Sequence, residues 1–443
     1  MIGISSLKRH FFLISLMILA LAISAAVALA ADAAGIVNSL AKEKAEKTQP
    51  IENVEALDNF YAALALTAAK KPGALTRVAH FGDSLIEMDL LSGQTRRRLQ
   101  TKWGDGGHGF VLVSPSKAWY HPMDLYYKPD LKWMGNDMSM MKLRDRRFGL
   151  GGAVAICFKA KAKTVVGTDN DGPVGHKVSR FDILFPIEPD GGEVEIKVDG
   201  KSLGVINTNG PSFTEGYARI DMPDDRHKLE IKAMKPKTRM YGVIMESKGP
   251  GVVYDSLGVN GTGVSSFLKL DHVHWSEQLR HRNPNLVILG FGTNEATSTL
   301  DPKRYQRKVE RIVKIVKEAL PGSSVLIMAP VDKAKKQGTS LVSNSAITKV
   351  VEAQRAAAKA SGAALWSTFD AMGGEGSMAR WYNSTPRLGA GDLMHPTPEG
   401  GKVLGDMFYN ALMQGFADYL AKKGVPSSAP AAPATTLQKV EIK

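Results

Sequence analysis

Two short motifs, far apart in the chain, carry the residue types of nucleophilic catalysis. Ser84 lies in Phe81-Gly-Asp-Ser-Leu85, and His395 follows Asp392 by three positions in Asp392-Leu-Met-His395-Pro396. A serine hydroxyl is a weak nucleophile until a neighbouring base takes its proton. A carboxylate three positions before a histidine can accept a hydrogen bond from one ring nitrogen. The other ring nitrogen is then available as the base.

Each motif also has an ordinary structural explanation. Gly-Asp-Ser is a common tripeptide, and Ser84 could simply cap the helix that follows it. It is not the Gly-x-Ser-x-Gly turn of the α/β-hydrolases. In the second motif, Thr397 could cap a helix that begins near Glu399. Neither motif establishes a catalytic site without the other.

Two further segments could stabilise the negative charge of a tetrahedral intermediate. Gly290-Phe-Gly-Thr-Asn-Glu295 follows the apolar run at 285–291, so that the Asn294 amide is expected at a strand end. Ser256-Leu-Gly-Val-Asn-Gly-Thr-Gly263 is a glycine-rich turn, in which a backbone N–H can point outward. Hydrogen-bond donors of these two kinds are what an oxyanion requires.

These segments are positioned by a pattern of alternating strands and helices. A strand is expected at 76–81, before Ser84, and three more apolar strands are expected at 285–291, 324–329 and 364–369. Helices are expected at 50–70, 89–102, 302–320, 345–361 and 400–421. Strands that alternate with helices in this way indicate a parallel sheet flanked by helices, with right-handed crossovers.

The middle of the chain, residues 105–250, has a different character. It is rich in glycine and in short alternating segments, among them Glu193-Val-Glu-Ile-Lys-Val198, which a hairpin signal at Asp199-Gly200 follows. Further strands are expected at 181–185, 227–232 and 239–246. Several short strands at this spacing predict a β-sandwich, of jelly-roll type, inserted in the α/β domain.

An aromatic-rich stretch begins just after the helix at 89–102. Either these residues pack between the two domains, or they form a sugar-stacking surface near the cleft. The residues are Trp103, Trp119, Tyr120, Tyr126, Tyr127 and Trp133.

The composition restricts cofactors and partners. The single cysteine, Cys157, excludes an intrachain disulfide and is expected to be buried in an apolar run. A formal net charge of +13 favours anionic polymers, yet no recognisable nucleic-acid-binding motif is present. His272 and His274 lie on different faces of a predicted helix without a carboxylate or cysteine cluster, so neither a metal nor a cofactor is expected.

The first thirty residues have the pattern of a secretory signal. A basic start at Lys8-Arg-His10 precedes an apolar stretch from Phe11 to Leu29, and Ala28-Leu-Ala30 offers a cleavage site. We therefore expect a periplasmic or secreted protein. If the segment is not cleaved, it would anchor the protein to a membrane instead.

Taken in order, the four motifs resemble the blocks of the SGNH (GDSL) hydrolase superfamily. The resemblance implies that Ser84 is the nucleophile, that His395 is the general base and that Asp392 orients it. It also implies an oxyanion hole made by the N–H of Ser84, the N–H of Gly261 and the side chain of Asn294. Gly258 and Gly263 are the alternatives to Gly261.

An inserted β domain between the serine and glycine blocks is similar to the layout of bacterial peptidoglycan O-acetylesterases. The segment leading from Tyr241-Gly-Val through Gly249-Pro-Gly-Val-Val-Tyr-Asp255 into the glycine block resembles the same group. This resemblance implies a carbohydrate-binding-like insert and an esterase that removes O-acetyl groups from an envelope polysaccharide, most specifically peptidoglycan. The alternatives are a polysaccharide O-acetyltransferase, a glycan-binding protein without catalysis, and a lipase.

These expectations divide the chain into six parts. They are a signal peptide (1–30), a linker (31–49), the first part of the hydrolase domain (50–104), the inserted β-sandwich (105–250), the second part of the hydrolase domain (251–424) and a disordered tail (425–443).

Overall fold

The computed structural model describes residues 32–40, 48–169 and 171–426. The predicted signal peptide lies outside the described residues, as do parts of the predicted linker and tail. Within the predicted linker, residues 32–40 are helical, and Ile36 and Leu40 pack into an apolar core. No helix within the described ranges is long and apolar enough to cross a bilayer.

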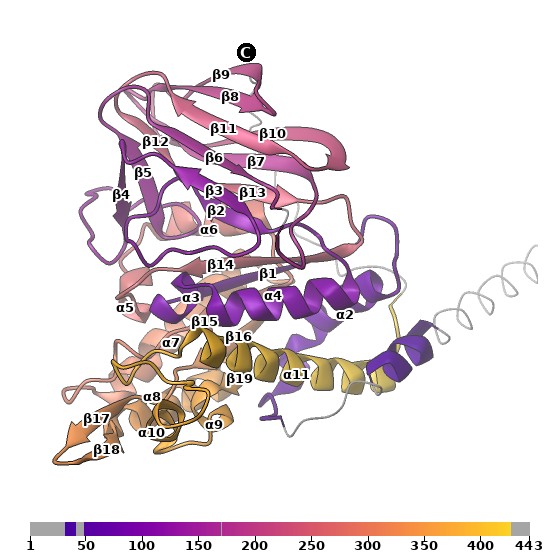
Figure 1. Cartoon of the computed structure of the whole chain (residues 1–443), viewed down its shortest axis with the longest axis vertical. Coiled ribbons are helices and arrows are strands. Elements are labelled where there is room, and N and C mark those ends of the chain that lie inside the picture. The colour runs from indigo at the N-terminus through magenta and orange to yellow at the C-terminus, as the bar shows by residue number, and fades with distance from the viewer. Residues whose placement is uncertain (1–31, 41–47, 170, 427–443) are drawn as a thin grey trace, which may run out of the picture.

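A five-stranded parallel sheet lies at the centre of the α/β domain (Figure 1). Its strand order is β14-β1-β15-β16-β19, so the strand that carries the serine motif, β1, is an inner strand. The strands are β1 (Leu75–Gly82), β14 (Gly251–Gly258), β15 (Leu286–Gly290), β16 (Ser324–Ala329) and β19 (Ala364–Ser367). The apolar runs at 285–291 and 324–329 are thus confirmed as buried parallel strands.

Helices cover both faces of this sheet because neighbouring residues of each strand point to opposite sides. On β15, Val287 and Leu289 join one core with the helices α5 to α8, whereas Leu286 and Ile288 join the other core with α2, α4 and α11. The helices of the first group are α5 (Val264–Phe267), α6 (His272–Arg282), α7 (Pro302–Ala319) and α8 (Ser345–Ser361). Those of the second are α2 (Asp58–Ala68), α4 (Leu90–Trp103) and α11 (Pro398–Lys423).

Shorter elements complete this domain. The hairpin β17–β18, which has no counterpart in the sequence expectations, packs beside α10. The elements are η1 (Val54–Leu57), α3 (Ser84–Glu87), β17 (Ala334–Gln337), β18 (Ser340–Ser343), α9 (Thr368–Ala371) and α10 (Ser377–Tyr382).

The β domain stands on the edge of the α/β domain next to β14 (Figure 1). Its antiparallel sheets share one apolar core, to which Val111, Phe181 and Ile231 contribute. One sheet contains β10 (Thr214–Asp225), β7 (Val178–Ile187), β13 (Gly242–Glu246) and β2 (Gly109–Leu112). A second contains β3 (Tyr126–Pro129), β6 (Lys163–Gly167), β11 (Lys228–Ala233), β8 (Glu193–Val198) and β9 (Lys201–Asn207), and a third contains β12 (Thr238–Met240), β5 (Ala153–Cys157) and β4 (Trp133–Asp137).

Two expected strands differ from the structure. The strand expected at 239–246 is wrong as a single element, because it divides at Tyr241 into β12 and β13, which belong to different sheets. The strand expected to reach residue 369 ends at Ser367, whose side chain accepts a hydrogen bond from the Asp370 N–H and caps α9. A continuous apolar run does not reveal where the chain passes from one sheet to another.

Buried ion pairs join the β domain to the α/β domain. The guanidinium of Arg282 on α6 contacts Asp255 on β14 at 2.6 Å and Glu246 on β13 at 2.7 Å. Glu246 also accepts two hydrogen bonds from Arg77 on β1. Burial opposes ionisation of Glu246, but the two arginines prevail and hold its pKa well below the usual range.

Candidate active site

Ser84 is the first residue of α3, immediately beyond the carboxyl end of β1. The turn is fixed by Asp83, whose side chain accepts a hydrogen bond of 3.1 Å from the Leu85 N–H. Ser84 is buried, and its Oγ lies 2.7 Å from Nε2 of His395. The structure therefore brings together two residues that are 311 positions apart.

His395 and Asp392 share the turn that precedes α11. Oδ2 of Asp392 lies 2.6 Å from Nδ1 of His395, while Oδ1 accepts the backbone N–H groups of Met394 and His395, each at 3.0 Å. Thr397 caps α11 by accepting from the Gly400 N–H. The prediction that Thr397 caps a helix is therefore confirmed, and the same segment also contains the hydrogen bond between Asp392 and His395.

The hydrogen bonds of this turn orient the His395 ring. Partial burial pushes the pKa of Asp392 upward, but hydrogen bonds from the backbone and ring of His395 prevail and hold that pKa below its usual value. An ionised Asp392 accepts a hydrogen bond from the Nδ1–H group of His395, so Nε2 is left to accept a hydrogen bond from the Ser84 hydroxyl. The arrangement can remove a proton from Ser84 as its oxygen attacks an electrophile.

Gly261 is the glycine of its block that is open to solvent. Its φ is +78°, and a Cβ added there would meet no atom closer than 4.0 Å. A Cβ on Gly258 would collide with the backbone of Glu87, and one on Gly263 would collide with Glu295. Within the described ranges, the backbone N–H of Gly261 has no hydrogen-bond acceptor, whereas the N–H of Thr262 donates to Val259 O. The geometry thus favours Gly261 over the two alternatives.

Asn294 reaches the same block from the end of β15. Its Nδ2 donates to the carbonyl oxygen of Thr262 at 2.8 Å, and the residue is exposed. An amide nitrogen has two protons, so the second one is available to a ligand. Ser84, Gly261 and Asn294 therefore follow the neighbouring ends of β1, β14 and β15, and the turn with Asp392 and His395 reaches this edge of the sheet at Ser84.

Two enclosed carboxyl groups lie beneath these strand ends. Burial raises the pKa of Asp83 to about 6 and that of Glu295 to about 7. Glu295 accepts the N–H of Val264 at 2.8 Å, which fixes the start of α5 after the glycine block. These two carboxyl groups hold the backbone of the loops that carry Ser84 and the glycine block.

The β domain contributes residues that the sequence motifs did not identify. Of the aromatic stretch, Trp103, Tyr120 and Trp133 are buried, whereas Trp119 is 40% exposed and its ring centroid lies 5.3 Å from that of His395. Lys117, on the same loop, donates to the carbonyl oxygen of Asn260 at 2.5 Å. The aromatic cluster was the only sequence signal for this loop.

Other features identified from the sequence have structural roles. One ring nitrogen of His274 accepts the Gly149 N–H, and the other contacts Glu215 of the β domain. Cys157 is buried, as expected, and its thiol donates to Lys159 O.

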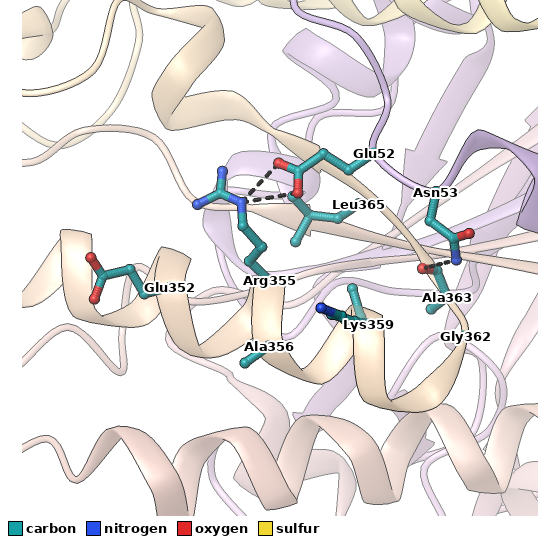
Figure 2. Close-up of a pocket in the computed structure, with 10 residues that line it drawn as sticks. Glu52, Asn53, Glu352, Arg355, Ala356, Lys359, Gly362, Ala363 and Leu365 are labelled. Carbon is teal, nitrogen blue, oxygen red and sulfur yellow. Dashed lines mark hydrogen bonds and ion pairs between the residues drawn. The ribbon is translucent and has the colours of Figure 1, made fainter.

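A cavity of about 720 Å³ lies elsewhere, between η1, α8 and the start of β19 (Figure 2). Arg355 spans part of it and pairs with Glu52, as the dashed lines show. The start of a parallel strand lies at the opposite end of the sheet from Ser84, which follows the carboxyl end of β1. This cavity is therefore separate from the Ser84–His395 pair.

Comparison with known proteins agrees with this geometry. Residues 210–403 match the model of the GDSL-like Lipase/Acylhydrolase family, a stretch that includes His395 but not Ser84. No curated protein matches the sequence. A solved structure described as "Peptidoglycan O-acetylesterase in action, 5 min" has a TM-score of 0.69 and 23% identity, over 81% of this chain and 96% of that chain.

A second solved structure is a family two carbohydrate esterase from Cellvibrio japonicus, with 11% identity over 67% of this chain and 99% of that chain. Its TM-score of 0.27 is too low to bear on the fold. The match to the peptidoglycan O-acetylesterase structure covers 81% of this chain, so it extends over both the parallel sheet and the β domain. Residues 210–403 of this chain therefore form a domain of the GDSL-like Lipase/Acylhydrolase kind, and the chain shares its fold, a parallel sheet flanked by helices with an added β domain, with that peptidoglycan O-acetylesterase structure.

Proposed function

We propose that this protein is a secreted or periplasmic serine esterase that removes O-acetyl groups from peptidoglycan. The observation that carries the proposal is the hydrogen-bonded series Asp392–His395–Ser84, which lies beside the donors at Gly261 and Asn294. The secretory pattern of residues 1–30 supports the location. The fold shared with a peptidoglycan O-acetylesterase supports the choice of polymer.

The residues at the site account for both halves of the reaction. As Oγ of Ser84 attacks the acetyl carbonyl carbon, its proton moves to Nε2 of His395, and the oxyanion receives hydrogen bonds from Gly261 and Asn294. The ester bond breaks, and His395 protonates the departing sugar oxygen. A water molecule then gives a proton to His395 as its oxygen attacks the acyl-serine; the bond from the acyl carbon to Oγ breaks, His395 returns the proton to Oγ of Ser84, and acetate is released.

Trp119 supports a carbohydrate substrate. Its partly exposed ring lies next to the His395 ring, on the side of the site that the β domain provides. An aromatic face in this place can pack against the apolar face of a sugar ring whose hydroxyl carries the acetyl group. The β domain would thus take part in binding the leaving group of the reaction.

The test is acetate release from O-acetylated peptidoglycan by the wild type and by Ser84→Ala. The variant removes the nucleophile and is expected to lower the rate by at least about 10⁴-fold while the protein stays folded. O-acetylated xylan and a long-chain p-nitrophenyl ester are compared in parallel. We expect faster release from peptidoglycan than from either of them.

De-O-acetylated peptidoglycan is the substrate control, and the melting temperature of Ser84→Ala is the folding control. Equal activity of the variant would overturn the assignment of the nucleophile. Preference for the long-chain ester would favour a lipase, and transfer of acetyl to a glycan acceptor without acetate release would favour a transferase.

A further inference from the structure

Lys117 links the β domain to the oxyanion side of the site. It lies on the loop after β2, and its ammonium group donates to Asn260 O at 2.5 Å and to Ser139 Oγ at 2.6 Å. Oδ2 of the buried Asp137 lies 3.6 Å away. Three acceptors therefore surround the three protons of this ammonium group, so Lys117 is a fixed part of the structure and not a mobile surface side chain.

Asn260 is held on its other side as well. Its backbone N–H donates to Oε2 of Glu87 at 2.5 Å, and Glu87 is buried at the end of α3, the helix that begins with Ser84. Burial raises the pKa of Glu87 to about 7. Asn260 is thus bound between a side chain of the serine helix and a side chain of the β domain.

This arrangement determines the direction of the Gly261 N–H. The carbonyl of Asn260 and the N–H of Gly261 belong to the same peptide group, which is planar and trans, so the two bonds point in opposite directions. A cation that holds Asn260 O therefore aims the Gly261 N–H away from Lys117. A glycine at φ +78° lacks the side chain that would otherwise limit rotation of this peptide.

We propose that Lys117 is a positioning residue that orients and polarises the Asn260–Gly261 peptide as an oxyanion donor. The inference rests on the proposed esterase function, since it concerns the same Ser84 chemistry. A positively charged group that is hydrogen-bonded to the carbonyl oxygen also polarises the peptide, so its N–H becomes a stronger donor. The β domain would then serve the chemical step itself as well as substrate binding.

The experiment measures kcat and KM for p-nitrophenyl acetate in Lys117→Met, Lys117→Arg and Lys132→Met. Methionine fills a similar volume but has neither charge nor donor, so we expect kcat to fall by about 10–100-fold while KM changes less than about twofold. Arginine keeps the charge and a donor and is expected to restore part of kcat. Lys132 lies on an exposed turn of the same domain and serves as the matched control.

The rate at which a fluorophosphonate labels Ser84, read by mass spectrometry, is measured for the same variants at a temperature where all are folded. Labelling should slow in Lys117→Met in parallel with kcat. If the wild type labels at Ser84 but hydrolyses no ester, the proposed function fails, and the labelling rates alone decide the role of Lys117. Unchanged labelling and kcat in Lys117→Met, or a loss that tracks only the folded fraction, would overturn this inference.

Discussion

At the scale of single residues, the site depends on the turn from Asp392 to His395. In this turn the Asp392 carboxylate accepts hydrogen bonds both from the backbone and from the His395 ring. Leu393 has a φ of +60°, and this bend lets Asp392 bind the His395 ring with one oxygen and the backbone with the other. The bond to the ring is short, although the Asp392 side chain is 43% exposed. Water therefore competes for this carboxylate.

Asp392→Asn tests this residue directly. An amide in this position can stabilise the wrong ring tautomer and carries no charge to stabilise the imidazolium, so we expect kcat to fall by about 10²–10⁴-fold. Exposure of the pair places the effect nearer the lower figure. The measurement is kcat on p-nitrophenyl acetate at pH 7, with Asp406→Asn on α11 as the control. Wild-type kcat in Asp392→Asn would remove Asp392 from the mechanism.

The raised pKa of Glu295 predicts that the stability of the protein depends on pH. Burial raises this pKa from 4.5 to about 7, so between these pH values the folded protein holds a proton that the unfolded chain has lost. The contribution of Glu295 to stability should therefore decrease as pH rises through this window, with a limiting slope of about 1.4 kcal/mol per pH unit. Glu295→Gln keeps an acceptor for the Val264 N–H and should lack this dependence.

Urea unfolding of the wild type and Glu295→Gln between pH 4 and 8 measures this difference. The variant should gain stability relative to the wild type as pH rises, whereas the exposed control Glu318→Gln should not. Two parallel curves would show that the pKa of Glu295 is the same in the folded and the unfolded protein.

At the scale of elements, a buried charged side chain joins α6 to the strands beneath it in addition to apolar contacts such as Trp275 against Phe81. Arg282 is buried and pairs with one carboxylate on β14 and another on β13. These strands belong to different sheets, so this single side chain ties the β domain to the parallel sheet. Arg282 thus fixes the segment from β13 to β14, through which the chain passes from the β domain to the glycine block.

Arg282→Leu should therefore be strongly destabilising. It leaves Asp255 buried without a cation, and uncompensated charges of this kind cost about 3–5 kcal/mol. Glu246 retains Arg77, so the expected loss lies toward the lower figure. Urea denaturation gives the change in unfolding free energy, and Lys314→Ala at an exposed i,i+4 pair should change it by less than about 0.5 kcal/mol. Equal effects of the two variants would contradict the structural role of Arg282.

At the scale of the whole molecule, the chain combines a composite site with a strongly basic composition. The loop with Lys117 and Trp119 comes from the β domain, while Ser84 and His395 come from the α/β domain. The net charge of +13 favours anionic polymers over neutral ones. Binding of an anionic acetylated glycan should therefore weaken with salt.

We expect KM for O-acetylated peptidoglycan to rise severalfold between about 0.05 and 0.5 M salt, since screening shortens the range of these charges. KM for neutral p-nitrophenyl acetate should stay constant over the same range. A KM for the glycan that does not depend on salt would show that the net charge has no part in substrate binding.

The sequence by itself was sufficient for four of the five strands of the parallel sheet, all except β14, and for the residues at their carboxyl ends. Buried parallel strands are continuous apolar runs, and their carboxyl ends meet at one edge, so Ser84 and Asn294 could be placed together from pattern alone. His395 followed from its motif, because Asp392 lies only three positions away and local geometry can join them.

Only the tertiary structure decided which β-domain residues reach the site. Lys117 meets Asn260 across 143 positions, and nothing in its local sequence distinguishes it from other lysines. Trp119 differs from its buried aromatic neighbours only in exposure, and the split at Tyr241 depends on which sheet receives each half. Periodicity records which faces of an element are buried, whereas the partner that buries them is determined by how the two domains pack.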